Sequence, residues 1–394
     1  MFSFLLAIIY LCFVSLGLPD SLLGASWPTI HQDFNVPLSF AGIVSVTSCV
    51  CTIISSLLSD RLTKKFSPGL VTVASIALSA IGLLGYSLSN NFFLLVLFAI
   101  PYGLGAGGVD ASLNNYVALH YESKHMSWLH AMWGLGTVIS PYIMGYALTR
   151  GEGWNQGYFI VSIIQFCICF IVFLTISKWH KNNNDTQTND KVLSLKEIFN
   201  IRGAAPCFIT FFCYCALETT AMLWASSYLV EVRGLSEEVA AMLASLFCIG
   251  ITVGRIINGF LTMKLKDKTL IKLGIAVLMV SVILLFIPNT ITTIIAFILI
   301  GLGCAPIYPS IIKSTPRLFG EENSQAMIGV QMAFAYIGVL LMPPLFGVIS
   351  GVLSLKILPV YLLTILILMI IMNEITNKSR TKVINFKKSI TLGK

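Results

Sequence analysis

Long apolar runs separated by short polar turns dominate the chain. Cutting the sequence at polar breaks and at breaks that carry Pro or Gly gives twelve candidate helices, centred near residues 16, 50, 78, 106, 138, 166, 217, 249, 279, 304, 336 and 364. A helix needs about 20 mainly apolar residues to cross a bilayer. The first run, Phe2 to about Trp27, lacks the basic start of a secretory signal, so we predict a retained first span.

The longest polar stretch nearly bisects the chain. It runs from Lys178 to Arg202 and is rich in Asn and charged residues. We therefore predict four parts: an N-terminal six-helix bundle over 1–178, a cytoplasmic linker over 179–202, a C-terminal six-helix bundle over 203–376 and a basic cytoplasmic tail over 377–394. A solvated anchor is the favoured role for the tail, with lipid or partner binding as the alternative.

Basic residues orient the spans. With both termini in the cytoplasm, only Arg150, Arg233 and Lys356 fall outside and Arg255 lies within a span, while the rest of the 25 Lys and Arg face the cytoplasm. The positive-inside rule favours this orientation, in a bacterial plasma membrane. Lysines that face an anionic leaflet also explain the net charge of +8 without a nucleic-acid partner.

Composition supports a membrane protein. Charged residues make up 11% of the chain, against about 25% in soluble domains. All ten cysteines lie in apolar runs, which predicts buried thiols. Residues two apart on a helix face different ways, so the Cys-x-Cys pairs predict no metal site. The glycine run GLGAGGVD lies in a span and precedes no βαβ unit, so we expect helix packing, no cofactor and no enzyme.

The two halves repeat their small residues and prolines in the same order. Spans 4 and 10 begin such tracts with Gly103 and Gly105 or Gly301 and Gly303, and spans 5 and 11 share a spacing at Gly136, Pro141, Gly145 and Gly338, Pro343, Gly347. Two parallel six-span repeats, with a binding site between them near mid-membrane, characterise one transporter architecture.

The segment SLLSDRLTKKF resembles the loop signature between helices 2 and 3 of the major facilitator superfamily. Asp60, Arg61, Lys64 and Lys65 match that signature, Ser56 and Thr63 stand where glycines are usual, and Met263 replaces the second-half aspartate. The resemblance implies an all-α membrane protein with twelve transmembrane helices in two pseudo-symmetric bundles. It also implies a conformational latch at Asp60 and Arg61, because a carboxylate can bridge to a helix N-terminus.

Four further segments are similar to the fucose permease and sugar-proton symporter branch: GLPDSLLGASWPTI, GLGAGGVDASLNNYVALHY, MSWLHAMWGLGTVISP and CYCALETTAMLWASSYLVE. In that branch, carboxylates in helices 1 and 4 carry proton coupling and sugar recognition. Asp20 and Asp110 occupy those segments here. Trp133 stands where the fucose permease pattern has a polar residue, which argues against fucose itself.

Charged residues deep in spans are costly and usually face a wet cavity or a partner. Asp20 lies at a Gly-Leu-Pro break, and Trp27 follows seven residues later, so a carboxylate and a stacking ring would suit a polyol. The alternatives are a kink-capping role for Asp20 and an interfacial position for Trp27.

Asp110 and Asn114 are four apart and share a helix face, which predicts a proton site that senses water entry. A purely structural bond from Asp110 to Asn114 or Arg255 is the alternative. His130 could join a proton relay or simply bond a neighbouring helix, and Trp133 could line the cavity or pack.

Glu218, followed by Trp224, resembles the helix 7 glutamate of the branch and is predicted on the substrate or coupling-ion path. Arg255 is predicted to pair with a carboxylate or to reach the interface, assisting the latch.

The leading hypothesis is proton-coupled uptake of a sugar or similar hydroxylated solute by a monomer in the lipid bilayer. Efflux of drug-like compounds by the same fold is the main alternative, and a non-transporting membrane sensor is a third.

Overall fold

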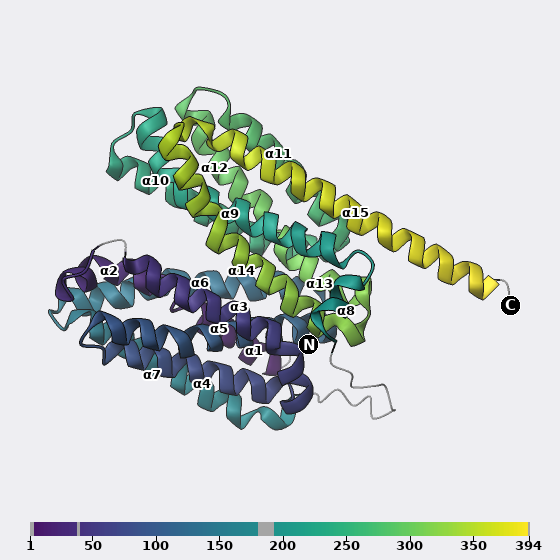
Figure 1. Ribbon diagram of the computed structural model, residues 1–394, viewed down its shortest axis with the longest axis horizontal. Coiled ribbons are helices and arrows are strands. Elements are labelled where there is room, and N and C mark those ends of the chain that lie inside the picture. The colour runs from purple at the N-terminus through teal and green to yellow at the C-terminus, as the bar shows by residue number, and fades with distance from the viewer. Residues whose placement is uncertain (1–3, 38–39, 180–192, 393–394) are drawn as a thin grey trace. The chain divides into compact units, whose positions relative to one another are not determined.

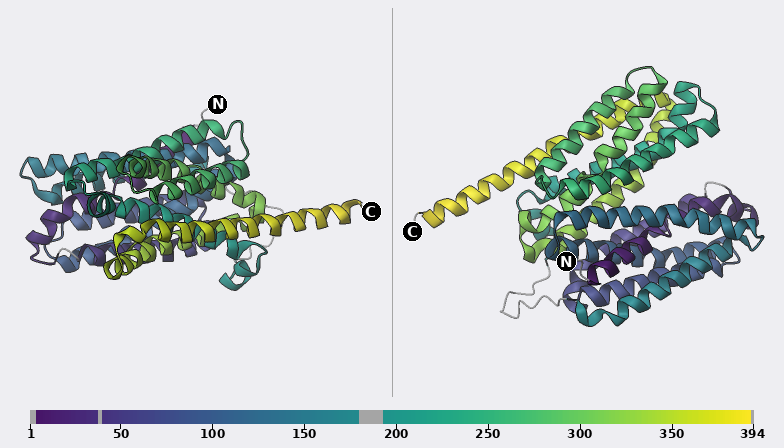
Figure 2. Two further views of the ribbon diagram at one scale, coloured as in Figure 1. Left: turned by 90° about the horizontal axis from the view of Figure 1, so that it is seen from above. Right: turned by 180° about the vertical axis from the view of Figure 1, so that it is seen from behind.

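The computed structural model describes residues 4–37, 40–179 and 193–392, and within these ranges the chain forms helices and turns without strands. Its contacts divide it into two compact units. The first comprises residues 1–117 and 128–192, and the second comprises 118–127 and 193–394. Figure 1 shows each unit as a bundle of helices that run alongside one another, and Figure 2 shows the same bundles from two further sides.

The first unit is built from the helices of the N-terminal half. They are α1 (Phe4–Gly17), α2 (Leu22–Asp33), α3 (Ala41–Phe66), α4 (Pro68–Ser87), α5 (Phe92–His120), α6 (Ser123–Thr149) and α7 (Gly153–Leu174). The end of α5 and the start of α6 belong to the second unit by their contacts.

The second unit is built from the helices of the C-terminal half. They are α8 (Leu195–Asn200), α9 (Ala204–Arg233), α10 (Glu237–Leu261), α11 (Asp267–Leu285), α12 (Thr290–Cys304), α13 (Ile307–Phe319), α14 (Glu321–Val352) and α15 (Leu358–Leu392). Short 3-10 turns lie at Ile176–Lys178 and Leu355–Ile357.

These helices make up the predicted twelve spans. Ten segments in the described chain are long and apolar enough to cross a membrane, with α1–α2 and α12–α13 each forming one interrupted span. The other two spans are α6, of 27 residues, and α10, of 25 residues. At a rise of about 1.5 Å per residue, both are long enough to cross the hydrocarbon core. The predicted all-α fold is confirmed.

Most of the repeated glycines make matching contacts in the two units. Gly145 and Gly347 do not, because a Cβ on Gly145 would meet nothing within 4 Å, whereas one on Gly347 would meet Trp224. A Cβ on Gly103 of α5 would collide with the Ser48 carbonyl of α3, and one on Gly301 of α12 would collide with the Phe247 carbonyl of α10. Likewise, a Cβ on Gly136 of α6 would meet α1, and one on Gly338 of α14 would meet α9. Small residues allow helix backbones to approach this closely in membranes.

Three more glycines belong to the α5 run: a Cβ on Gly107 would meet Thr52 of α3, and one on Gly105 or Gly108 would meet Ser75 of α4. The run therefore packs closely against both α3 and α4, as predicted for helix packing.

The cysteine prediction is partly wrong. All ten cysteines are free, but Cys167 and Cys248 are exposed on the surface of the chain. An apolar span in a bilayer does not need to bury every thiol in protein, because its outer face contacts lipid.

The predicted part boundaries at residues 178, 202 and 376 stay predictions. Of the linker, residues 180–192 lie outside the described residues, as do the side chains of the tail from 380 onward.

Gly136→Ala should destabilise the protein, because its new Cβ would collide with the Val14 carbonyl of α1. Overpacking of this kind costs about 1–3 kcal/mol. Gly145→Ala is the matched control on the same helix, since a Cβ there meets nothing within 4 Å. Thermal melting of the detergent-purified protein checks this. Equal Tm values for the two variants would show that the α1–α6 contact tolerates a methyl group.

Candidate functional site

The chain leaves helical geometry between α1 and α2, and this break presents Asp20. Residues 18–21 form turns, and Pro19 within them has no N–H to donate to a helix. The Asp20 Oδ2 accepts a hydrogen bond from the Trp133 indole N–H at 2.8 Å, and its Oδ1 accepts one from the Tyr102 hydroxyl at 3.1 Å. Three spans therefore meet at one carboxylate.

Close helix packing places both partners of Asp20. A Cβ on Gly17 would collide with the main-chain carbonyl of Trp133 itself, so α1 touches α6 one turn from Asp20. A Cβ on Gly82 of α4 would lie 2.6 Å from the Cβ of Tyr102, which places Tyr102 directly against α4. The two hydrogen-bond donors are thus fixed by backbone contacts.

A second polar cluster in the same unit is more deeply buried. The Asn114 amide nitrogen donates to the Asp110 carboxylate at 2.7 Å and to the Asp110 main-chain carbonyl at 3.0 Å. The His130 Nε2 lies 3.1 Å from the Asn114 amide oxygen. Asp110 is 4% exposed and His130 is 5% exposed, so this chain of polar groups is enclosed by protein.

The hydrogen bonds within this cluster set its protonation pattern. Because the Asn114 nitrogen donates to Asp110, its oxygen faces His130 and can only accept. His130 therefore donates from Nε2. The Phe13 ring of α1 contacts the His130 ring edge-on, with centroids 5.3 Å apart, which fixes the imidazole plane. The predicted pair of Asp110 and Asn114 is present, and His130 extends it.

The second unit holds a buried ion pair. Arg255 of α10 lies 3.5 Å from the Glu218 carboxylate of α9, and Arg255 is 4% exposed. Glu218 retains partial exposure, with 15% of its side chain accessible. Arg255 therefore pairs with the glutamate of its own unit.

The tryptophans predicted beside the charged residues take different positions. Trp27 is buried in an apolar cluster, with its ring near those of His31 and Phe92. The turns at residues 18–21 interrupt the helix, so the seven-residue spacing no longer places Asp20 and Trp27 on one helix face. Trp224 donates its indole N–H to the Pro343 carbonyl at 3.0 Å and packs on Phe346 of α14.

The predicted latch residues lie at the end of α3. Asp60 is buried and pairs with Lys64 one turn on, with Oδ2 and Nζ 3.1 Å apart, and Arg61 is exposed. The other oxygen of Asp60 is buried and, within the described residues, has no hydrogen-bond partner. Bridging by Asp60 to another helix stays a prediction.

Sequence reasoning missed Tyr102 and Lys313. Tyr102 follows Pro101 in the glycine-rich span, and no spacing rule ties it to Asp20 across 82 residues. In the second unit, the Lys313 ammonium donates to the Ala118 carbonyl at 2.6 Å and to that of Tyr121. A cation is favoured at these carbonyls because α5 ends there. Asn258 donates to Ser127 at 2.7 Å in the same region.

No cofactor group is indicated by the site chemistry. Within the described ranges, no group of three or more His, Cys, Asp and Glu side chains is placed to hold a metal ion. The clusters consist of carboxylates with hydrogen-bond donors, which suit binding of hydroxyl groups and transfer of protons.

Two curated proteins resemble this chain over most of its length. Bypass of stop codon protein 6 of Saccharomyces cerevisiae is 23% identical over 384 residues, covering 88% of this chain and 77% of that protein. The glucose/mannose transporter GlcP of Bacillus subtilis is 22% identical over 310 residues, covering 76% of this chain and 77% of that protein.

Solved structures share the fold. FucP in the outward conformation matches with a TM-score of 0.79 at 16% identity, over 94% of this chain and 99% of that one. A second FucP structure is described as the Escherichia coli fucose:proton symporter. The resemblance to the sugar-proton symporter branch is thereby confirmed at the level of the fold.

The family model of the Major Facilitator Superfamily matches residues 9–293 and, in a second match, residues 207–379. Together with the twelve spans and the repeated glycine contacts, this shows that the chain belongs to the Major Facilitator Superfamily.

Proposed function

We propose that this chain is a secondary active transporter that works by alternating access and couples proton movement to the uptake of a sugar or a similar small hydroxylated solute. The Asp20 carboxylate, held between Trp133 and Tyr102, carries the proposal. A plasma-membrane monomer with both termini in the cytoplasm belongs to the same proposal.

Asp20 has the chemistry to bind a polyol. A carboxylate accepts hydrogen bonds from hydroxyl groups, and hydrogen bonds to a charged group contribute about 1.5–3 kcal/mol each. Asp20 is exposed in the folded chain, so its remaining lone pairs can accept from a solute. The Trp133 ring beside it offers an apolar surface for the C–H face of a sugar. Similarity to a protein named as a glucose/mannose transporter supports this solute class.

Asp110 is the proposed proton site. Its carboxylate is enclosed by protein and accepts a hydrogen bond from the neutral Asn114 amide, so its proton affinity depends on whether water reaches it. Water that reaches Asp110 from one side of the membrane and then from the other would let the carboxylate bind a proton on one side and release it on the other. His130 stands at the other end of the amide and can relay that proton, since imidazole titrates near neutral pH.

Glu218 and Arg255 provide a second charged pair on the proposed path. A partly exposed carboxylate beside a buried guanidinium can exchange its partner for a solute hydroxyl or a proton during transport. Breaking a buried pair is costly, which would link its release to binding of the solute.

Asp110→Asn should abolish solute-driven proton flux, because an amide cannot exchange a proton at this site. A pH-sensitive dye inside proteoliposomes measures that flux. Solute counterflow, which needs no net proton movement, should persist in the variant. Glu374→Gln is the control, since Glu374 faces Lys272 at 3.6 Å away from both clusters. Full proton flux in Asp110→Asn would rule out Asp110 as the coupling group.

Trp133→Phe should raise the KM for the solute by roughly tenfold or more, because Asp20 loses one charge-assisted hydrogen bond while an aromatic ring remains. Trp154→Phe is the matched control. It removes a similar indole bond, from Trp154 to Asp33 at 2.7 Å, in the apolar cluster of the same unit. Radiolabelled uptake at varied solute concentration gives both KM values. A KM change of the same size in both variants would indicate general destabilisation.

A further inference from the structure

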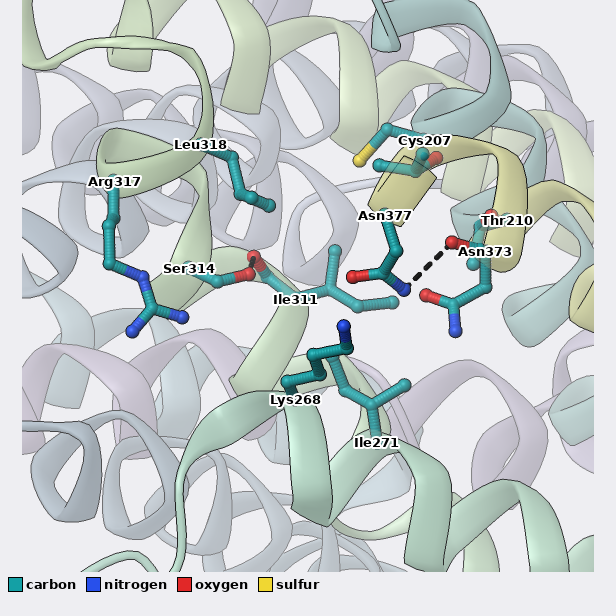
Figure 3. Close-up of a pocket in the computed structure, with 11 residues that line it drawn as sticks. Cys207, Thr210, Lys268, Ile271, Ile311, Ser314, Arg317, Leu318, Asn373 and Asn377 are labelled. Carbon is teal, nitrogen blue, oxygen red and sulfur yellow. Dashed lines mark hydrogen bonds between the residues drawn. The ribbon is translucent and has the colours of Figure 1, made fainter. Parts of the chain in front are cut away.

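A small cavity opens in the second unit, and none of the residues in the three clusters of the proposed transport path line it. Its volume is about 30 Å³, which admits roughly one water-sized group. The polar and charged lining residues come from α9, α11, α13 and α15, and they are Thr210, Lys268, Ser314, Arg317, Asn373, Thr376 and Asn377. Figure 3 shows Lys268 rising toward Asn373 and Asn377, with Arg317 on the far side of Ser314.

The cavity lies at one common end of four spans. Lys268 is the second residue of α11, and Arg317 lies two residues before the end of α13. Thr210 is in the first two turns of α9, and Asn377 lies near the end of the apolar span Leu355–Ser379. Residues at span ends lie at the depth of lipid headgroups.

Cationic and amide side chains supply hydrogen-bond donors at this site. Thr210 and Ser314 already donate to main-chain carbonyls of their own helices, at 2.8 and 2.9 Å. Neither Lys268 nor Arg317 forms a salt bridge within the described residues, and both are exposed. Asn373 is only 8% exposed, and its side chain faces the cavity without a described hydrogen bond.

Nearby carboxylates offset only part of the positive charge at the cavity. The lining residues include no Asp or Glu. Asp267 is buried beside the site and interacts electrostatically with Arg317 and Lys313. Glu374 turns to Lys272, at 3.6 Å. Lys313 adds a further positive charge close to Asp267 and Arg317.

We propose that this cavity binds the phosphate group of an anionic phospholipid, with Lys268 and Arg317 as cationic ligands and Asn373 as a neutral donor. The cavity is too small to enclose a phosphate, so one oxygen enters while the rest of the group lies at the rim between the two cations. Cys207 and the apolar side chains of Ile271, Ile311 and Leu318 complete the lining, and the apolar side chains suit the glycerol and acyl region better than water. A bound lipid would tie α11, α13 and α15 together at this end of the unit.

The test uses the full-length protein in nanodiscs of phosphatidylcholine with increasing mole fractions of phosphatidylglycerol. Phosphatidylglycerol should raise the Tm of the wild-type protein in a saturable way. In the double variant Lys268→Gln, Arg317→Gln, the half-saturating mole fraction should rise by roughly tenfold or more. Lys272→Gln is the matched control, because Lys272 lies one turn further along α11, faces Glu374 and does not line the cavity.

Three results would overturn the proposal. The double variant could respond to phosphatidylglycerol as the wild type does, or Lys272→Gln could weaken the response equally, which would indicate surface charge alone. Inorganic phosphate could reproduce the Lys268- and Arg317-dependent rise in phosphatidylcholine nanodiscs, which would assign the site to a soluble anion. If the double variant fails to fold, the single variants Lys268→Gln and Arg317→Gln should each show an intermediate loss of the response, and an unchanged response in both would contradict lipid binding.

Discussion

The close approach of α1 and α6 is the constraint on which the first unit depends. Gly17 and Gly136 let the two backbones touch; Gly17 lies within one turn before Asp20, and Gly136 lies within one turn after Trp133. At one level the contact brings the Trp133 indole to Asp20. On the same two helices, the Phe13 ring of α1 packs against the His130 ring of α6, and His130 belongs to the Asp110 cluster. One packing contact therefore aligns both the proposed solute-binding carboxylate and the proposed proton site.

The low polarity of the membrane explains why the charged residues stand in small groups. An isolated charge in a span is costly, so each carboxylate has found donors: Asp20 has an indole and a phenol, Asp110 an amide, and Glu218 a guanidinium. These partners differ in what they allow. A neutral amide partners Asp110, whereas a guanidinium partners Glu218. The two units thus place different groups beside their intramembrane carboxylates.

Hydrophobic length and glycine spacing predicted the fold because both are local properties of the sequence. Twelve spans and the packing role of the α5 glycines could both be predicted without coordinates. The pairing of Asp110 with Asn114 followed from the four-residue helical period. Contacts between distant segments could not be predicted. Tyr102 meets Asp20 because Gly82 sets how α4 and α5 pack, and Trp27 lies in an apolar cluster because turns at residues 18–21 interrupt the helix at Asp20.

The most direct measurement of the central claim is solute accumulation in proteoliposomes under an imposed proton gradient, with the membrane potential held at zero. Hexoses, deoxyhexoses, polyols and amphipathic dyes would be compared. The proposed symport predicts that an acidic exterior drives at least one hydroxylated solute inward above its external concentration, and that a protonophore abolishes the accumulation. Extrusion of dyes with no accumulation of any hydroxylated solute would contradict it.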